Sequence, residues 1–187
     1  MGKLVVSQFM TVDGVVEDPG GSEDMDRGGW AFEFDRGEDG DRFKLDEVMA
    51  ADALLLGRIT YEGFAAAWPS REGEFADKFN NMPKYVVSTT LSDPEWNNST
   101  VISDDVPGEI AKLKEHHEGD VLVNGSVRLV QTLAENGLVD EYRLMVFPTV
   151  LGAGKRLFGD LPAAAPLELT ETTSAGQTLI LVYRPAP

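Results

Sequence analysis

Residues 54–62 read Leu-Leu-Leu-Gly-Arg-Ile-Thr-Tyr-Glu, an apolar run that leads through a Gly-Arg-x-Thr turn into a helical pattern. This stretch predicts a strand followed directly by a helix. At such a junction Gly57 lets the backbone approach a ligand, the helix start supplies unpaired N–H groups, and Arg58 offers a two-pronged phosphate contact. The turn therefore favours an anionic ligand. The alternative is an ordinary strand-to-helix turn, in which Thr60 only caps the helix.

A second junction of the same kind follows the apolar residues 121–123. There Asn124-Gly125-Ser126 precedes a helical pattern over 127–135. Two such junctions suit a ligand with two separated phosphate groups, such as a dinucleotide, and we expect them to converge in space. Neither junction matches the Gly-x-Gly-x-x-Gly fingerprint, so the sequence does not predict an ordinary Rossmann site.

The rest of the chain predicts alternating strands and helices, followed by a hairpin. Expected strands cover 3–10, 53–56, 84–91, 100–103, 120–126, 141–147, 167–173 and 178–184, and expected helices cover 38–51, 60–67, 106–117 and 127–135. The first helix is expected to turn Phe43, Val48 and Met49 inward. The pattern indicates an α/β fold: a mixed sheet with a parallel centre and an antiparallel C-terminal hairpin, flanked by helices. Ligands of such sheets bind at the carboxyl ends of the strands.

Composition narrows the possible functions. The chain has 187 residues, which predicts one domain over 1–187, and it has no cysteine, which excludes a thiol nucleophile and thiolate-ligated zinc. A net charge of −16 argues against binding to nucleic acid or to an anionic membrane surface. The first residues lack a signal-peptide layout, so we expect the cytoplasm. His116-His117 alone does not predict a metal site.

Taken together, the motifs carry a resemblance to a known family. The chain resembles the dihydrofolate-reductase-like fold, and specifically the reductase domain at the C-terminus of the riboflavin-biosynthesis deaminase–reductase RibD, in its stand-alone bacterial form. The matching segments occur in the family's order and cover nearly the whole chain. They are 7–14 (Ser-Gln-Phe-Met-Thr-Val-Asp-Gly), 54–62, 84–90, 121–129, 138–144 and 148–158.

This resemblance implies NADPH as the cofactor and assigns residues to it. The Gly-Arg-x-Thr turn would bind phosphates, and Arg58 would face the 2′-phosphate or the pyrophosphate. The family often has paired glycines where this chain has Asn124-Gly125. The implied cofactor-binding residues are Gly57, Arg58, Thr60, Ser88, Thr89, Asn124, Gly125 and Ser126, with Ser88 and Thr89 on the adenosine side. The implied substrate-binding residues are Gly154 and Lys155, whose family motif lies near the substrate.

Two carboxylates are candidates for the proton donor. Asp13 lies in the loop after the first strand, where the family has its Asp-Gly, and its alternative role is to accept backbone N–H groups in a turn. Asp41 lies sixteen residues before Gly57, roughly where folate reductases carry their acid. Its alternative role is to cap or complement the start of a helix.

The first functional hypothesis is an NADPH-dependent reductase of a pyrimidine- or pteridine-like heterocycle, resembling 5-amino-6-(5-phosphoribosylamino)uracil reductase. The alternative is a nucleotide-binding module that keeps the fold without turnover. A third hypothesis is a structural dimerisation domain that pairs through residues 138–147. We expect a small-molecule substrate and a homodimer.

Overall fold

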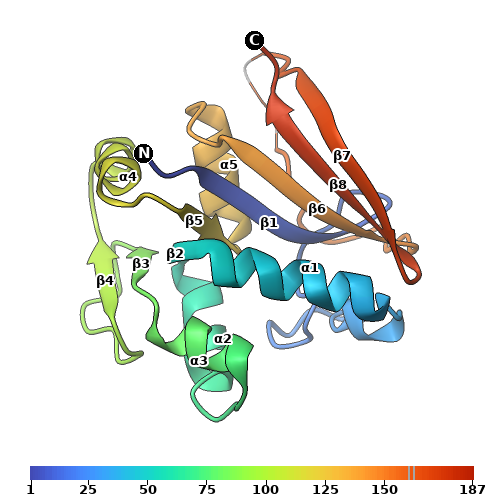
Figure 1. Ribbon diagram of the computed structural model, residues 1–187, viewed down its shortest axis with the longest axis horizontal. Helices are drawn as coiled ribbons and strands as arrows, with labels where there is room; N and C mark the ends of the chain where they lie inside the picture. The colour runs from blue at the N-terminus through green and yellow to red at the C-terminus, as the bar shows by residue number, and fades with distance from the viewer. Residues whose placement is uncertain (160, 162) are drawn as a thin grey trace.

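A computed structural model of the chain describes residues 1–159, 161 and 163–187. Its elements alternate between strands and helices before a final hairpin (Figure 1). In chain order they are β1 (Leu4–Thr11), the 3₁₀ helix η1 (Trp30–Glu33), α1 (Gly37–Ala50), β2 (Ala51–Gly57), α2 (Arg58–Ala67), α3 (Glu74–Asn81), β3 (Lys84–Val87), β4 (Ser99–Ile102), α4 (Val106–His116), β5 (Asp120–Val123), α5 (Val127–Glu135), β6 (Glu141–Phe147), β7 (Leu167–Ala175) and β8 (Thr178–Pro185).

These strands form one eight-stranded sheet in the order β4-β3-β2-β5-β1-β6-β8-β7. The strands from β4 to β6 are parallel, while β8 runs antiparallel to both β6 and β7. The predicted fold class, with its parallel centre and C-terminal hairpin, is confirmed. Because β5 lies between β1 and β2, the loops that follow these three strands gather at one edge of the sheet.

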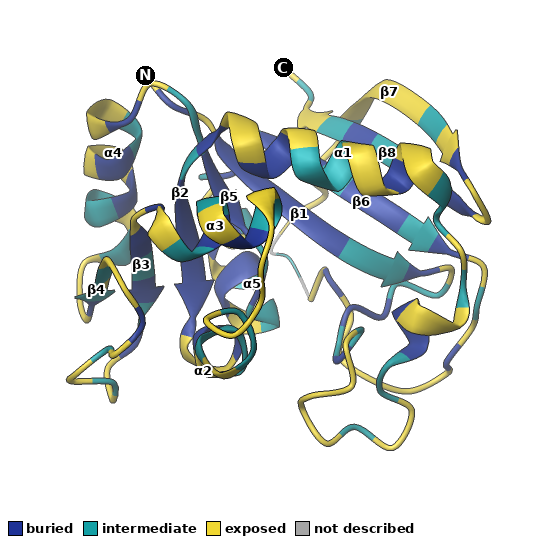
Figure 2. Ribbon diagram, turned by 60° about the horizontal axis from the view of Figure 1, so that its bottom comes forward, coloured by how far each residue is buried: buried dark blue, intermediate teal, exposed yellow. Residues whose placement is uncertain are grey.

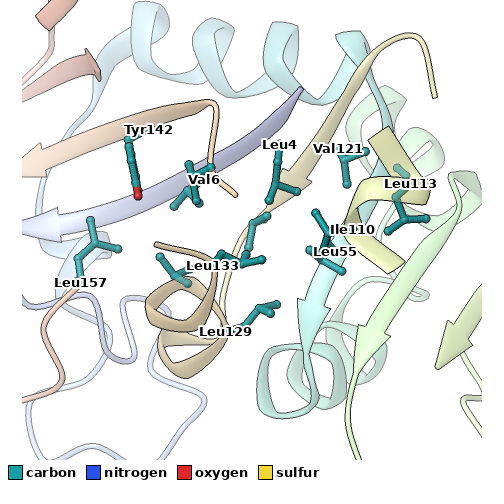
Figure 3. Close-up of a cluster of buried hydrophobic side chains, with 14 of the residues drawn as sticks. Leu4, Val6, Leu55, Ile110, Leu113, Val121, Leu129, Leu133, Tyr142 and Leu157 are labelled. Carbon is teal, nitrogen blue, oxygen red and sulfur yellow. The ribbon is translucent and has the colours of Figure 1, made fainter. Parts of the chain in front are cut away.

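Helices cover both faces of the sheet. Figure 3 shows the face under α4 and α5, where Leu55, Val121 and Leu133 belong to one buried hydrophobic cluster. Burying each such leucine stabilises the fold by about 1.5–3 kcal/mol. The other face is covered by α1 and α3, whose Val48 and Phe79 belong to a second cluster.

The structure differs from the predicted elements in several places. The helix α3 and the 3₁₀ helix η1 were not expected, and β3 and β5 end at Val87 and Val123, before the residues with polar side chains. In α1, Val48 is buried as predicted, but Met49 is 42% exposed, so its predicted inward position is wrong. The buried stripe of α1 contains Glu47 instead, and Figure 2 shows this helix striped between buried and exposed residues.

The start of α1 is tied to the turn between β7 and β8. The Asp35 N–H donates to Gln177 Oε1 at 2.8 Å, and the Gln177 N–H donates to the Asp35 carbonyl at 2.7 Å. Gly37 has a φ of 61°, and a Cβ there would lie 3.2 Å from the backbone nitrogen of Gly176. Close backbone contact at both glycines therefore fixes one end of α1 on the C-terminal hairpin.

Lys84 joins α3 to the strands beside it. Its side chain is fully buried, and Nζ donates to the carbonyl oxygens of Asn80, Met82 and Asn97 at 2.8–2.9 Å. The ammonium group also lies 4.3 Å from the centroid of the Trp96 ring. These contacts satisfy all three of its N–H donors.

The loop after β1 is built around a buried carboxylate. Asp18 is 2% exposed, and its oxygens accept the backbone N–H groups of Ser22, Glu23 and Met25. The Trp30 indole donates to the Glu17 carbonyl at 3.0 Å. Both contacts hold this loop in place beside the carboxyl ends of the strands. Within the described part of the chain, no helix has the length and apolar character needed to cross a membrane.

Candidate active site

The two turns expected to bind phosphate lie against each other. The Gly57 N–H donates to the Gly125 carbonyl oxygen at 3.1 Å, and the hydroxyl oxygens of Thr60 and Ser126 are 3.5 Å apart. They meet because β2 and β5 are neighbours in the sheet and end at the same edge. The predicted convergence is confirmed.

Glycine is required at both turns because the two turns approach each other so closely. A Cβ at Gly57 would lie 2.8 Å from the Ser126 Cβ and closer still to its hydroxyl oxygen. Gly125 has a φ of 123°, and a Cβ there would lie 2.5 Å from Thr60 Oγ1. Glycine reaches such a φ without a steric penalty. The two glycines therefore leave open the space that larger side chains would fill.

Both turns lead directly into helices. The N-cap residues Gly57 of α2 and Ser126 of α5 make no capping hydrogen bond through a side chain. The first N–H groups of a helix lack partners within the helix, and the helix dipole favours negative charge beside them. The site thus presents two sets of donors to one anionic ligand.

Arg58 supplies positive charge at the first turn. Its side chain is 44% exposed, and its Nη1 atom lies 2.9 Å from Glu62 Oε1, one turn along α2. An exposed pair at this spacing contributes only about 0.3–0.5 kcal/mol. A phosphate group can therefore displace Glu62 from Arg58 at little cost.

A cavity of about 1400 Å³ opens beside these turns. One wall comes from β1 and α1, where Ser7, Phe9 and Lys44 face the cavity, and Phe32 of η1 also contributes. The volume exceeds the roughly 300–1000 Å³ of an ordinary small-ligand pocket, so the space suits a dinucleotide together with a second ligand. Predicted site residues that line it are Asp41, Gly57, Arg58, Thr60, Ser88, Thr89, Asn124, Gly125, Ser126 and Lys155.

The remaining predicted residues, Asp13 and Gly154, do not line the cavity. A Cβ at Gly154 would lie 2.7 Å from Val15 Cγ1, so this residue packs against the loop after β1. Its neighbour Lys155 forms an ion pair through Nζ with Glu17, and hydrogen bonds from Lys155 lower the pKa of the Glu17 carboxyl.

Asp13 makes the contacts of a turn carboxylate. Its oxygens accept from the Thr11 hydroxyl at 2.6 Å and from the backbone N–H groups of Leu151 and Gly152 at 3.2 and 2.9 Å. These bonds, the one from Thr11 above all, lower the pKa of Asp13 to about 2. Such a carboxyl is a poor proton donor near neutral pH. The geometry therefore favours its alternative role, which is to join two loops.

An Asp13→Asn variant should be less stable than the parent protein near neutral pH. The pKa of Asp13 is about 2 in the folded protein against an ordinary 3.8, so its stabilising effect is present above about pH 4 and is lost as pH falls toward about 2. Urea unfolding at several pH values tests this. The stability difference between parent and variant should shrink through that window, and a constant difference would contradict the assignment.

Asp41 does line the cavity, but at its exposed side. Its side chain is 66% exposed, and Oδ1 accepts from Arg36 Nε at 2.5 Å. The residue lies within the second turn of α1 rather than at the N-cap position, which is Arg36. Its role as a proton donor stays a prediction.

Comparison with known proteins decides the family. A family model of the RibD C-terminal domain matches residues 2–181. The chain belongs to the RibD C-terminal domain family. The resemblance found in the sequence is confirmed. The chain is also 29% identical over 188 residues to the uncharacterized protein YyaP of Bacillus subtilis strain 168, a match that covers 97% of this chain and 94% of YyaP.

Solved structures agree with this RibD-type fold. A putative riboflavin biosynthesis protein from Shewanella sp. PV-4 superimposes with a TM-score of 0.78 at 19% identity, over 99% of both chains. The dihydrofolate reductase of Enterococcus faecalis, complexed with NADP(H) and RAB-propyl, superimposes with a TM-score of 0.53 at 13% identity, over 99% of this chain and 97% of that one. The dihydrofolate-reductase-like fold is confirmed.

The second turn contains an unusual peptide bond. The bond between Gly125 and Ser126 is cis. The Asn124 Nδ2 atom donates to the Ser7 carbonyl at 3.4 Å. The second turn is thereby joined to β1.

Sequence reasoning missed a buried ionic cluster on the inner side of α1. Lys44 Nζ donates to Ser7 Oγ at 2.8 Å and to Glu47 Oε1 at 2.5 Å, and Ser7 Oγ donates to the same Glu47 oxygen at 2.8 Å. Arg143 Nη1 lies 3.9 Å from Glu47 Oε2. The only signal in the sequence was Lys44 and Glu47 at helical spacing, which is usually a pattern of exposed positions.

Proposed function

We propose that this RibD-type protein is an NADPH-dependent reductase of a pyrimidine- or pteridine-like heterocycle. The convergence of two uncapped helix starts on one large cavity, with Arg58 beside them, carries the proposal. A protein with a net charge of −16 repels polyanions at long range, so local donors and cations must attract the ligand. The family membership supports a reductase.

The residues of the two turns fit NADPH. Gly57 and Gly125 form a cradle that a Cβ would fill, and the helix starts that follow them would hold the phosphate oxygens. Arg58 would bind the 2′-phosphate, and Thr89, which is exposed and lines the cavity, would lie on the adenosine side. Bound there, NADPH would supply a hydride.

The heterocycle would occupy the part of the cavity between β1 and α1. Phe9 and Phe32 line the cavity, and Phe32 is 79% exposed. Aromatic rings so placed can stack on a planar ligand and exclude water from it. Lys155 lies at the same cavity and would bind a phosphate on the substrate.

Titration with NADPH tests the proposal. Trp68 is half-buried and lines the cavity, so its fluorescence should respond to the cofactor in a saturable way. Consumption of NADPH in the presence of a heterocycle should follow. The absence of any saturable response would overturn the proposal. Binding without oxidation across a panel of pyrimidines and pteridines would favour a non-catalytic nucleotide-binding module.

Arg58→Ala is expected to weaken NADPH binding by about 10-fold or more and NADH binding much less. The reason is that one hydrogen bond to a charged group contributes about 1.5–3 kcal/mol, and only NADPH has the 2′-phosphate. Dissociation constants for both cofactors, measured by fluorescence, check this. Arg42→Ala is the matched control, because Arg42 is exposed on α1 and does not line the cavity. Equal losses for the two cofactors would show that Arg58 does not recognise the 2′-phosphate.

A further inference from the structure

Lys44 lies at a cavity wall although it is nearly buried. Its side chain is 12% exposed, against 69% for Lys112 on α4, and it faces the cavity together with Ser7 and Phe9. A lysine ammonium loses strong hydration on burial, so a position of this kind requires partners. Glu47, whose side chain is 1% exposed, is one partner, and Ser7 is the other.

The ammonium group of Lys44 keeps one donor for a ligand. It has three N–H bonds, and two of them are directed to Ser7 Oγ and Glu47 Oε1. For the third, no hydrogen-bond acceptor exists among residues 1–159, 161 and 163–187. Nζ lies 5.4 Å from the centroid of the Phe9 ring, which also lines the cavity. A planar ligand stacked near Phe9 would therefore come within reach of this donor.

Lys44 is also close to the second phosphate-binding turn. Ser7 contacts Lys44 through its hydroxyl and Asn124 through its carbonyl, and Asn124 directly precedes Gly125. Asn124 Oδ1 is buried and has no hydrogen-bond partner within the described part of the chain. This row of contacts runs from the phosphate turn to the ammonium group. Gly125 and Lys44 both line the cavity and are linked through Asn124 and Ser7.

We propose that Lys44 is a catalytic residue that donates a hydrogen bond to the heterocycle and stabilises the negative charge that develops on it during reduction. This inference rests on the proposed function. In the step, a hydride adds to the carbon of a C=N bond, and the π electrons move to the nitrogen and onto a conjugated carbonyl oxygen. The nitrogen then takes a proton from water, and NADPH has lost the two electrons that the heterocycle gains. A fixed cation beside the acceptor lowers the barrier to this charge movement.

Ser7 and Glu47 are positioning residues in this scheme. The buried Glu47 carboxylate accepts from both Lys44 and Ser7, which fixes the direction of the ammonium group. Arg143 lies near the other carboxylate oxygen and contributes to the charge balance. The charge of Lys44 is therefore held in place before any ligand arrives, as electrostatic catalysis requires.

A fixed donor at the cavity wall also sets which edge of a heterocycle can bind. A ring that presents carbonyl oxygens can accept from Lys44, whereas an edge with an amino group would place donor against donor. Lumazine and pterin make a matched pair of probes. The two pteridines differ in having a carbonyl oxygen or an amino group at one ring position, and both can be followed by fluorescence.

The test is titration of lumazine and pterin into the full chain, at a pH where both are neutral, without NADPH and then with it. The parent protein should bind lumazine about 10-fold or more tightly than pterin, the factor that one hydrogen bond to a charged group provides. Lys44→Met should remove this preference and leave the NADPH dissociation constant within about two-fold. Lys44→Arg should retain part of the preference for lumazine over pterin.

Controls separate the possible causes of failure. Lys112→Met removes the same charge from an exposed position that does not line the cavity. This variant should bind lumazine and pterin with the same affinities as the parent protein. If Lys44→Met fails to fold because Glu47 is left unpaired, Lys44→Met combined with Glu47→Gln removes both charges at similar volume and should again lose the preference. Equal affinities in the parent protein, no binding of either probe, or a preference that survives loss of Lys44 would overturn this role. Failure of the NADPH titration alone would overturn the proposed function instead.

Discussion

Gly57→Ala is expected to weaken NADPH binding by on the order of 100-fold, because at least two charge-assisted hydrogen bonds of about 1.5–3 kcal/mol each would be lost. A Cβ at this position lies 2.8 Å from the Ser126 Cβ, so the first turn must move away from the second. That movement breaks the bond from the Gly57 N–H to the Gly125 carbonyl and separates the two helix starts. The phosphate groups of one ligand could no longer contact both.

Fluorescence titration and thermal unfolding of the same samples check this prediction. Gly63→Ala is a control within the cavity wall, since it adds the same methyl group to α2 at another lining residue, where the nearest atom, Ser22 Oγ, lies at 3.7 Å. The control should bind NADPH as the parent protein does. If the Gly57 variant is folded and retains its affinity, the two turns do not share a ligand.

Lys84→Met is expected to destabilise the protein by about 3–5 kcal/mol. The carbonyl oxygens of Asn80, Met82 and Asn97, the first and last of them partly buried and that of Met82 buried, would lose their donor, and a buried polar group left unsatisfied costs about 1–3 kcal/mol. Methionine keeps most of the volume and tests the polar contacts rather than the packing. Urea unfolding measures the difference, and the exposed Lys112→Met should stay within about 0.5 kcal/mol of the parent. A loss below about 1 kcal/mol would contradict this role.

The same variant should alter the pH dependence of stability. Burial lowers the pKa of Lys84 to about 8 from an ordinary 10.5. Between these values the unfolded chain binds more protons than the folded protein at this site, so stability gains from rising pH. Lys84→Met removes this gain. Urea unfolding at about pH 8 and about pH 10 should show that the free energy of unfolding rises less with pH for the variant than for the parent.

The sheet could be predicted from the sequence because its strands carry strong local signals. Strand β2 contains the apolar run 53–56 and β5 the apolar run 121–123, and each run leads into a glycine turn before a helix. The short helix α3 gave no such signal, since its two buried residues, Ala76 and Phe79, are too few to mark a helical period. Its position is set by tertiary contacts, among them the bonds from Lys84.

The parts of the site that backbone turns form could be predicted from the sequence. The parts that depend on contacts between side chains of distant elements could not. Gly57 and Gly125 each stand between an apolar run and a helical pattern, so a few residues of sequence are enough to predict their turns. The cluster of Ser7, Lys44 and Glu47 joins β1 to α1, and no local pattern reports that two charged residues of a helix face inward. Asp13 was a reasonable candidate by position, but its contacts with Leu151 and Gly152 depend on a loop far along the chain.

The contact between α1 and the C-terminal hairpin positions one wall of the cavity from outside it. Among the described residues, none from β7 or β8 lines the cavity, yet Gln177 and Gly176 hold the beginning of α1. Insertions or affinity tags placed in this turn would displace α1 and change the distance between Ser7 and Lys44. On the proposed function, a substitution in this hairpin can therefore alter substrate preference without lying in the cavity wall.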